Sequence, residues 1–281
     1  MWSENKNSLM GFPFEEEINC HYAVSLLPLL PMRAEPSEKA EMLSQLLFGE
    51  RCFVKERSEK WTKIHNANHS YDGWVDSKMI TKISVTENDN LEKADFWQVK
   101  NVVASCFSEK LQQNMLLTFG SKFYNYDEKK EIAFFAGQVY KISKENLVRR
   151  NVDFSEKTLL EITSLFLNVP YLWGGKSALG IDCSGFTQLI FGAFGVQLPR
   201  DASQQVQVGQ TVDFFSQAKA GDLAFFDNPE GKIVHVGILL DNKTIIHASG
   251  RVKIEDFYPQ GIFSAEQNKY THSLRLIKRI I

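Results

Sequence analysis

One cysteine of this chain lies where its thiol could serve as a nucleophile. Cys183 belongs to the run IDCSGFTQLIFGAFG, in which apolar residues from Phe186 to Phe194 recur at helical spacing. The cysteine therefore falls at or just before the first turn of an amphipathic helix. Partial positive charge at a helix N-terminus lowers the pKa of a thiol, and the thiolate is the reactive form.

Two histidines have the spacing to supply the base that a cysteine nucleophile needs. His235 opens the predicted strand HVGILL, and His247 lies in the predicted strand TIIHAS, with a tight turn at residues 241–243 midway between them. We expect the two rings to meet across this hairpin. One would act on Cys183, and the other would orient it from behind.

The remaining cysteines and histidines have simpler explanations. Cys20, Cys52 and Cys106 do not pair at C-x-x-C spacing with one another or with Cys183, so a zinc site is poorly supported and no metal is expected. Buried cysteines usually act as small apolar residues. Three further histidines lie in polar surroundings and are expected at the surface: His65, His69 and His272.

Composition describes an ordinary globular protein with room for two or three small domains. The 281 residues carry a formal charge of −2, with 43% apolar and 23% charged residues. A nucleic-acid-binding surface usually needs a basic excess, and a membrane span needs about 18 consecutive apolar residues; neither is found. The N-terminus has no basic and apolar leader, so with Met1 as the native start we expect a cytoplasmic protein.

The pattern of elements changes near residue 150. Residues 18–150 are rich in short apolar segments separated by turns, and a stretch rich in helix formers, 37–48, interrupts this strand pattern. Residues 154–167 predict a helix with Ser155 as its N-cap. The segments LAFFD, HVGILL and TIIHAS then read as consecutive strands. Helices followed by an antiparallel sheet predict an α+β domain.

Five motifs in this half of the chain resemble the NlpC/P60 cysteine peptidases: YLWGGKSALGIDCSGFTQLIF, LPRDASQQ, GDLAFFD, HVGILL and IIHAS. The resemblance covers residues 152–281 and implies a papain-like fold that needs no metal or organic cofactor. It makes Cys183 the nucleophile, His235 the base and His247 the orienting residue. The hydroxyl of Tyr171 would help the backbone N–H of Cys183 to form the oxyanion hole.

The N-terminal half resembles a bacterial SH3-like (SH3b) module over residues 23–80, through the runs LLPMRAEPS, LLFGERCFV, KWTKI and YDGWV. Strand-like composition in residues 81–145 predicts a second, divergent barrel of this kind. The predicted organisation is an N-terminal extension (1–20), an SH3b domain (21–80), a second SH3b-like domain (81–148) and the catalytic domain (149–281).

An SH3b module before an NlpC/P60 domain resembles the γ-D-glutamyl-L-diamino acid endopeptidases (dipeptidyl-peptidase VI). That group cleaves cell-wall muropeptides with a free N-terminal L-alanine between D-glutamate and diaminopimelate or lysine, and releases L-Ala-D-Glu. A buried ammonium needs an anionic partner and a closed end that excludes longer chains. The resemblance and this logic nominate as substrate-binding residues Asp182, Ser184, Trp173, Tyr71 and Glu50.

Each nominated residue also has a structural alternative. Asp182 could only cap the helix of Cys183, Glu50 could be a turn carboxylate, and Tyr71 could be barrel packing. Arg200 and Asp201 of LPRDA are expected to form a wall or an ion pair.

Three functions remain open at this point. The leading one is a monomeric, cytoplasmic peptidase that recycles muropeptides, without nucleic-acid or membrane partners. An N-acetylmuramoyl-L-alanine amidase or an acyltransferase would keep the scaffold and change the bond. A wall-binding SH3b protein with a vestigial peptidase domain is disfavoured, because Cys183, His235 and His247 are all present.

Overall fold

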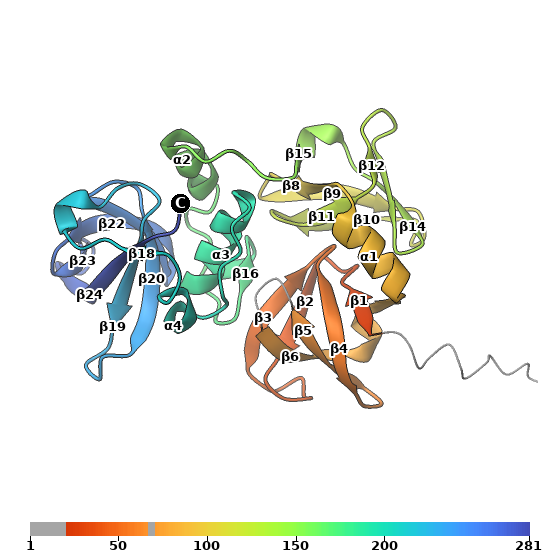
Figure 1. Cartoon of the computed structure of the whole chain (residues 1–281), viewed down its shortest axis with the longest axis horizontal. Coiled ribbons are helices and arrows are strands. Elements are labelled where there is room, and N and C mark those ends of the chain that lie inside the picture. The colour runs from red at the N-terminus through yellow and green to blue at the C-terminus, as the bar shows by residue number, and fades with distance from the viewer. Residues whose placement is uncertain (1–20, 67–70) are drawn as a thin grey trace, which may run out of the picture.

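The computed structural model describes residues 21–66 and 71–281 (Figure 1). The predicted extension 1–20, with Cys20, and the predicted surface residue His69 lie outside the described residues. Among the helices that are described, none combines the length and the apolar character needed to cross a bilayer.

The first part of the described chain forms a seven-stranded antiparallel sheet in the order β3-β2-β6-β5-β4-β1-β7. Every second side chain points inward, as Thr62, Ile64 and Asn66 do from β5. The SH3-like β-barrel predicted here is confirmed. Its strands are β1 (Tyr22–Val24), β2 (Leu29–Arg33), β3 (Met42–Leu47), β4 (Arg51–Arg57), β5 (Trp61–Asn66), β6 (Tyr71–Asp76) and β7 (Thr81–Ile83).

The stretch 37–48 does not interrupt the strand pattern, contrary to the sequence-based expectation. It contains β3, which pairs with β2 so that Leu29 lies opposite Leu47. Leu46 is buried in the core of the barrel, whereas Leu47, on the opposite face of the strand, is buried against the core of the C-terminal part. Burial on a pleated surface outweighs the helix propensity of these residues, because propensity is a weak preference that tertiary packing overrides.

The second part combines one helix with two small sheets. Helix α1 (Val85–Lys93), which the sequence pattern did not predict, begins at Ser84, whose hydroxyl accepts the N–H of Glu87 at 3.1 Å. The sheets have the orders β10-β9-β14-β13-β12 and β11-β8-β15. That they form a second SH3b-like domain stays a prediction. Their strands are β8 (Phe96–Val99), β9 (Val103–Ser108), β10 (Gln113–Thr118), β11 (Lys122–Tyr124), β12 (Tyr126–Asp127), β13 (Ile132–Phe135), β14 (Gln138–Lys141) and β15 (Leu147–Arg149).

Aromatic packing joins these first two parts. Phe48, which directly follows β3, inserts its ring 5.1 Å from that of Phe123 and 5.0 Å from that of Tyr140. Such tilted and edge-on pairs contribute beyond the area they bury. The N-terminal barrel therefore shares an apolar core with the second part.

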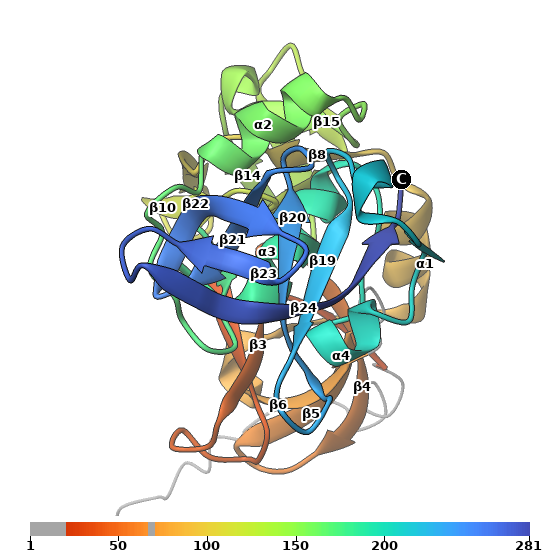
Figure 2. The ribbon, with the colours of Figure 1, turned by 90° about the vertical axis from the view of Figure 1, so that its left-hand side faces the viewer.

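The C-terminal part packs helices on one antiparallel sheet of order β18-β24-β19-β20-β21-β22-β23, in which β24 also pairs with β23. The predicted α+β arrangement is confirmed, and α3 lies between this sheet and the N-terminal barrel (Figures 1 and 2). The helices are α2 (Glu156–Ser164), α3 (Cys183–Ala193) and α4 (Ala202–Gln205). The strands are β16 (Lys176–Ser177), β17 (Gly180–Ile181), β18 (Gln210–Thr211), β19 (Leu223–Asp227), β20 (Ile233–Leu239), β21 (Thr244–Ser249), β22 (Arg251–Tyr258), β23 (Gly261–Ser264) and β24 (Lys269–Arg279).

Two caps set where the helices of this part begin. Ser155 caps α2 as predicted, in a capping box with Thr158. Asp182 caps α3 by accepting the N–H of Gly185 at 2.6 Å. Gly185 must be a glycine, because a Cβ there would lie 2.3 Å from the carbonyl oxygen of Gly175. Cys183 is thereby fixed at the first residue of α3, against the loop that precedes it.

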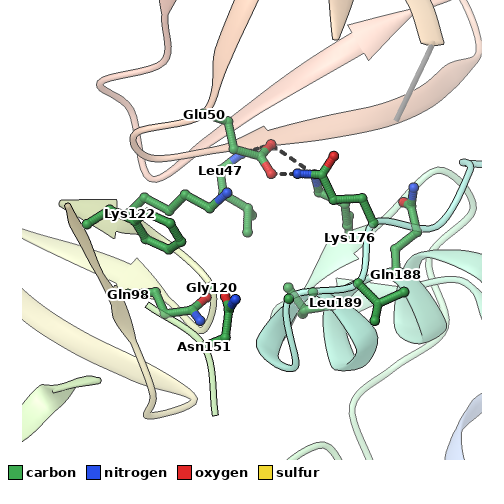
Figure 3. Close-up of a pocket in the computed structure, with 14 residues that line it drawn as sticks. Leu47, Glu50, Gln98, Gly120, Lys122, Asn151, Lys176, Gln188 and Leu189 are labelled. Atoms are coloured by element: carbon green, nitrogen blue, oxygen red, sulfur yellow. Dashed lines mark hydrogen bonds and ion pairs between the residues drawn. The ribbon is translucent and has the colours of Figure 1, made fainter. Parts of the chain in front are cut away.

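A buried ion pair crosses from the barrel to the C-terminal part. Lys176 Nζ lies 2.8 Å from each carboxylate oxygen of Glu50, and both side chains are almost fully buried. This pair lines a cavity of about 220 Å³, which Lys122 also lines. Figure 3 shows the pair and the residues around it. Lys176 and Glu50 therefore hold the N-terminal barrel against the C-terminal part of the chain.

Replacing Glu50 with glutamine is expected to destabilise the protein by about 3–5 kcal/mol, because it leaves the Lys176 charge buried without its carboxylate. Urea denaturation measures the change. Glu109→Gln breaks an exposed ion pair with Lys141 and serves as the matched control, with an expected effect below about 1 kcal/mol. Equal urea midpoints for the two variants would show that the buried ion pair contributes no more to stability than the exposed one.

Candidate active site

The sulfur of Cys183 is enclosed between α3 and β20. Only 7% of the residue is exposed, and the backbone N–H of Val236 on β20 points at the thiol. The residue before Val236 is His235, so the sheet brings the predicted base next to the predicted nucleophile.

Burial raises the pKa of the Cys183 thiol to about 12, and the neighbouring Asp182 carboxylate adds to the rise. The N–H groups of Val236 and Ser184 and the Arg200 guanidinium oppose it without reversing it. The expectation that the helix start lowers this pKa is therefore wrong for the free protein. Loss of hydration outweighs the helix dipole, whose effect is modest.

His235 and His247 meet as the hairpin pattern predicted. Nε2 of His235 lies 2.9 Å from Nδ1 of His247, and the rings are nearly perpendicular. The approach needs Gly237, where a Cβ would lie 3.0 Å from Cβ of His247. With its Nε2 engaged, His235 keeps Nδ1 for the thiol.

The second histidine has a further partner on the next strand. Nε2 of His247 lies 2.9 Å from Oε2 of Glu255 on β22, and Lys253 Nζ lies 3.1 Å from the other carboxylate oxygen. Burial opposes the charged carboxylate, yet the bond from His247 and the Lys253 ammonium hold the pKa of Glu255 at about 2.

His272 is half-buried, contrary to the freely exposed position expected for it. Its ring stacks on that of His235 with centroids 4.3 Å apart, and Phe226 packs beside both. The position on β24, directly after a register shift in the pairing with β23, turns this side chain inward. Burial lowers the pKa of His272 to about 4, and burial likewise lowers those of His235 and His247. The cluster is therefore uncharged at neutral pH.

These histidines also bear on metal binding. His235, His247 and His272 are the one group of possible ligands in the described residues whose atoms lie close enough for a metal ion, within 4.8 Å of one another. Nε2 of His235 and Nδ1 of His247 already bond to each other. Hydrogen bonding and stacking account for the cluster, and a reaction without metal or cofactor stays a prediction.

Asp182 is committed to the protein on both oxygens. It accepts the N–H of Gly174 at 2.9 Å and two N–H groups of Arg200, in addition to its bond with Gly185. The Arg200 guanidinium, 2% exposed, also donates to Ser184 and to Ser44 of β3. Asp182 therefore caps α3, which is the structural role considered for it from the sequence, and it forms the ion pair expected for Arg200. Its contact with substrate stays a prediction.

A cavity of about 470 Å³ opens beside Cys183. It is walled by both the C-terminal part and the N-terminal barrel, which contributes Tyr71 from β6. The Tyr71 hydroxyl donates to Asp201 at 3.1 Å, and burial together with that carboxylate raises its pKa to about 12. Of the nominated residues, those lining this cavity are Tyr171, Trp173, Asp182, Ser184 and Tyr71.

Glu50 does not line this cavity, so its nomination is wrong. Its carboxylate is held by Lys176 and by the N–H of Leu47, and it borders a different cavity. The barrel instead presents Glu41, which accepts the indole N–H of Trp173 at 2.6 Å. Glu41 was missed because it lies in the stretch taken as an interruption of the strands.

Glu255 was missed for a different reason. The segment RVKIEDFY gives a strand with alternating charges, which is typical of a solvated face. Its pairing with β21, in which Lys253 lies opposite His247, brings Glu255 diagonally to the ring. A tight hairpin predicted directly after TIIHAS would have paired the two segments and placed Glu255 near His247.

Comparisons with known proteins agree with this geometry. Residues 168–272 match the NlpC/P60 family, and residues 32–80 match the bacterial dipeptidyl-peptidase Sh3 domain. The chain is 30% identical over 223 residues to a gamma-D-glutamyl-L-lysine dipeptidyl-peptidase of Bacillus subtilis, covering 73% of this chain and 71% of that protein. It is 26% identical over 257 residues to dipeptidyl-peptidase 6 of Lysinibacillus sphaericus, covering 81% and 87%.

A solved structure shares the fold over nearly the whole described chain. It is the crystal structure of an NlpC/P60 family protein from Bacillus cereus, with a TM-score of 0.80 and 18% sequence identity. The similarity covers 92% of this chain and 99% of that one. At this identity it establishes the fold alone.

Acid is expected to destabilise the protein below about pH 6.5, because its buried histidines are neutral when folded. Their pKa values are lowered by folding, so the unfolded chain takes up protons first as the pH falls, and stability is lost from 6.5 toward the pKa of His272, about 4. Urea denaturation at pH 7.5 and pH 5 measures this. His272→Gln is expected to lessen the loss; an unchanged free energy of unfolding across this range would contradict it.

Proposed function

The chain belongs to the NlpC/P60 family of cysteine peptidases, and we propose that it hydrolyses the γ-D-glutamyl–diamino acid bond of muropeptides with a free N-terminal L-alanine, releasing L-Ala-D-Glu. The observation that supports this best is the placement of Cys183. It lies beside the His235–His247 pair and faces a cavity that the N-terminal barrel helps to wall. The similarity to peptidases named for γ-D-glutamyl-L-lysine bonds supports the same bond.

The reaction begins from a neutral thiol and a neutral imidazole. As the sulfur of Cys183 attacks the γ-carbonyl carbon of D-glutamate, Nδ1 of His235 takes the thiol proton. The backbone N–H of Cys183 and the hydroxyl of Tyr171 donate to the oxyanion. Burial and the nearby Cys183 raise the pKa of Tyr171 to about 12, so its hydroxyl keeps the proton that it must donate.

The second half of the reaction reverses these roles. The His235 imidazolium gives its proton to the amine of the leaving diamino acid as the C–N bond breaks, and a thioester remains on Cys183. A water molecule, deprotonated by His235, then attacks the thioester carbon. The C–S bond breaks, the new carboxyl group is released, and the His235 imidazolium returns the proton to the sulfur of Cys183.

The charges of the cavity support the proposed preference for a free amine. Among the described residues, the carboxylates of the cavity are Glu41, Asp182 and Asp201, and the one cation that lines it, Arg200, is already paired with Asp182. Glu41 and Asp201 therefore leave the cavity electronegative, which suits an ammonium group. Tyr71 and Trp173, which also line the cavity, would limit how far a peptide can extend beyond the ammonium group.

Recycling of trimmed muropeptides follows from such a preference. A monomeric protein acting in the cytoplasm, and the choice between diaminopimelate and lysine, stay predictions.

Incubation with L-Ala-γ-D-Glu-diaminopimelate and its lysine, N-acetylated and muramoylated forms tests the proposal by mass spectrometry. We expect L-Ala-D-Glu from the free-amine peptides only. Cys183→Ala is expected to abolish turnover, whereas Cys106→Ala, a buried cysteine in the second part, keeps it. Cleavage of the muramoylated form alone at the lactyl amide would establish the amidase instead.

Glu41→Gln is expected to raise KM for the free-amine peptide about 10- to 100-fold, the worth of a charge-assisted hydrogen bond. The rate constant kcat is expected to change little, because the proposed contact is to the ammonium group and not to the reacting atoms. Glu38→Gln removes an exposed carboxylate of the same loop that does not line the cavity, and serves as the control. Equal KM values for both variants would exclude Glu41 as the ammonium partner.

A further inference from the structure

The hydrogen-bonded pair of His235 and His247 is bonded in turn to the carboxylate of Glu255, which has no role in the mechanism proposed for Cys183. Nε2 of His235 bonds to Nδ1 of His247, and Nε2 of His247 bonds to Glu255, with both separations 2.9 Å. His247 is fully buried, and the Glu255 side chain is 6% exposed. The two bonds form one continuous chain from β20 through β21 to β22.

We propose that Glu255 is a positioning residue that determines which ring nitrogen of His247 and of His235 carries the hydrogen. Nδ1 of His235 is thereby kept as a hydrogen-bond acceptor for the thiol of Cys183. This rests on the catalytic roles proposed for Cys183 and His235.

The direction of the hydrogen bonds follows from the carboxylate. An ionised carboxylate only accepts, so Nε2 of His247 must carry a hydrogen. The Nδ1 of neutral His247 is then an acceptor, and Nε2 of His235 must donate to it. His235 therefore has its lone pair on Nδ1, the nitrogen left for the thiol. Without Glu255 the pair could reverse, which would place the hydrogen on Nδ1 and block the base.

Glu255 is held in the state that this role requires. Lys253, directly opposite His247 in the strand pairing, lies 3.1 Å from Oε1 of Glu255 and keeps it ionised. The other titratable groups packed around this carboxylate are His247 from β21 and His272 from β24. The same negative charge stabilises the positive charge that reaches the histidine pair when His235 takes the thiol proton.

Glu255→Gln tests the proposal, since an amide can donate to Nε2 of His247 and favour the reversed arrangement. We expect kcat to fall about 10- to 100-fold with KM nearly unchanged, as for partners that orient a catalytic histidine. Loss of the negative charge should also move the acid limb of the kcat/KM profile to lower pH. Asp256→Asn, the neighbouring exposed carboxylate, is the matched control and should change neither.

Two measurements separate positioning from a structural role. Nitrogen-15 NMR of the histidine rings in the inactive Cys183→Ala background should show hydrogen on Nε2 of both His235 and His247, and a shift toward Nδ1 when Glu255→Gln is added. This readout does not depend on the substrate, so it stands even if the proposed peptide is not cleaved. Glu255→Asp keeps the carboxylate and should preserve both tautomers and the acid limb.

A double-mutant cycle completes the test. If Glu255 acts through His247, Glu255→Gln should change kcat less than twofold in a His247→Gln background. Unchanged tautomers and an unchanged acid limb in Glu255→Gln, or full additivity in the cycle, would overturn the proposal and leave Glu255 as the ion-pair partner of Lys253. If Glu255→Gln does not fold, loss of the Nε2–H tautomers in Glu255→Asp would overturn it.

Discussion

The buried ion pair between Asp182 and Arg200 is the constraint on which the site depends. One carboxylate caps α3, holds the backbone of Gly174 and pairs with the guanidinium, which in turn donates to Ser44 of the N-terminal barrel. A charge-assisted bidentate pair is directional, and removing either partner would leave a buried charge. The start of the nucleophile helix, the loop before it and the barrel are therefore fixed together.

Burial also determines the protonation states of Cys183 and His235. The thiol of Cys183 and the imidazole of His235 lose hydration, which raises the pKa of the first and lowers that of the second. Both groups are neutral in the free protein. In the proposed mechanism, proton transfer therefore accompanies the attack of the sulfur, and the direction of the hydrogen bonds behind His235 determines which of its nitrogens accepts the thiol proton.

The barrel contributes more than a neighbouring domain. It supplies Tyr71 and Glu41 to the cavity next to Cys183, and Glu50 to the ion pair that anchors it. The wall of the cavity and the attachment of the barrel therefore use different carboxylates of one small domain. This division explains why a carboxylate chosen from its motif alone, Glu50, was assigned to the wrong task.

The sequence by itself determined the family, the α+β fold with its SH3-like barrel, the helix that begins at Cys183 and the meeting of His235 with His247. These depend on local periodicity, on caps and on one short hairpin, whose geometry the chain fixes over a dozen residues. Only the tertiary structure decided that Glu41 rather than Glu50 faces the cavity, that His272 packs on His235 and that Glu255 ends the histidine chain. Those contacts depend on strand register and on desolvation by distant segments, which a linear pattern does not contain.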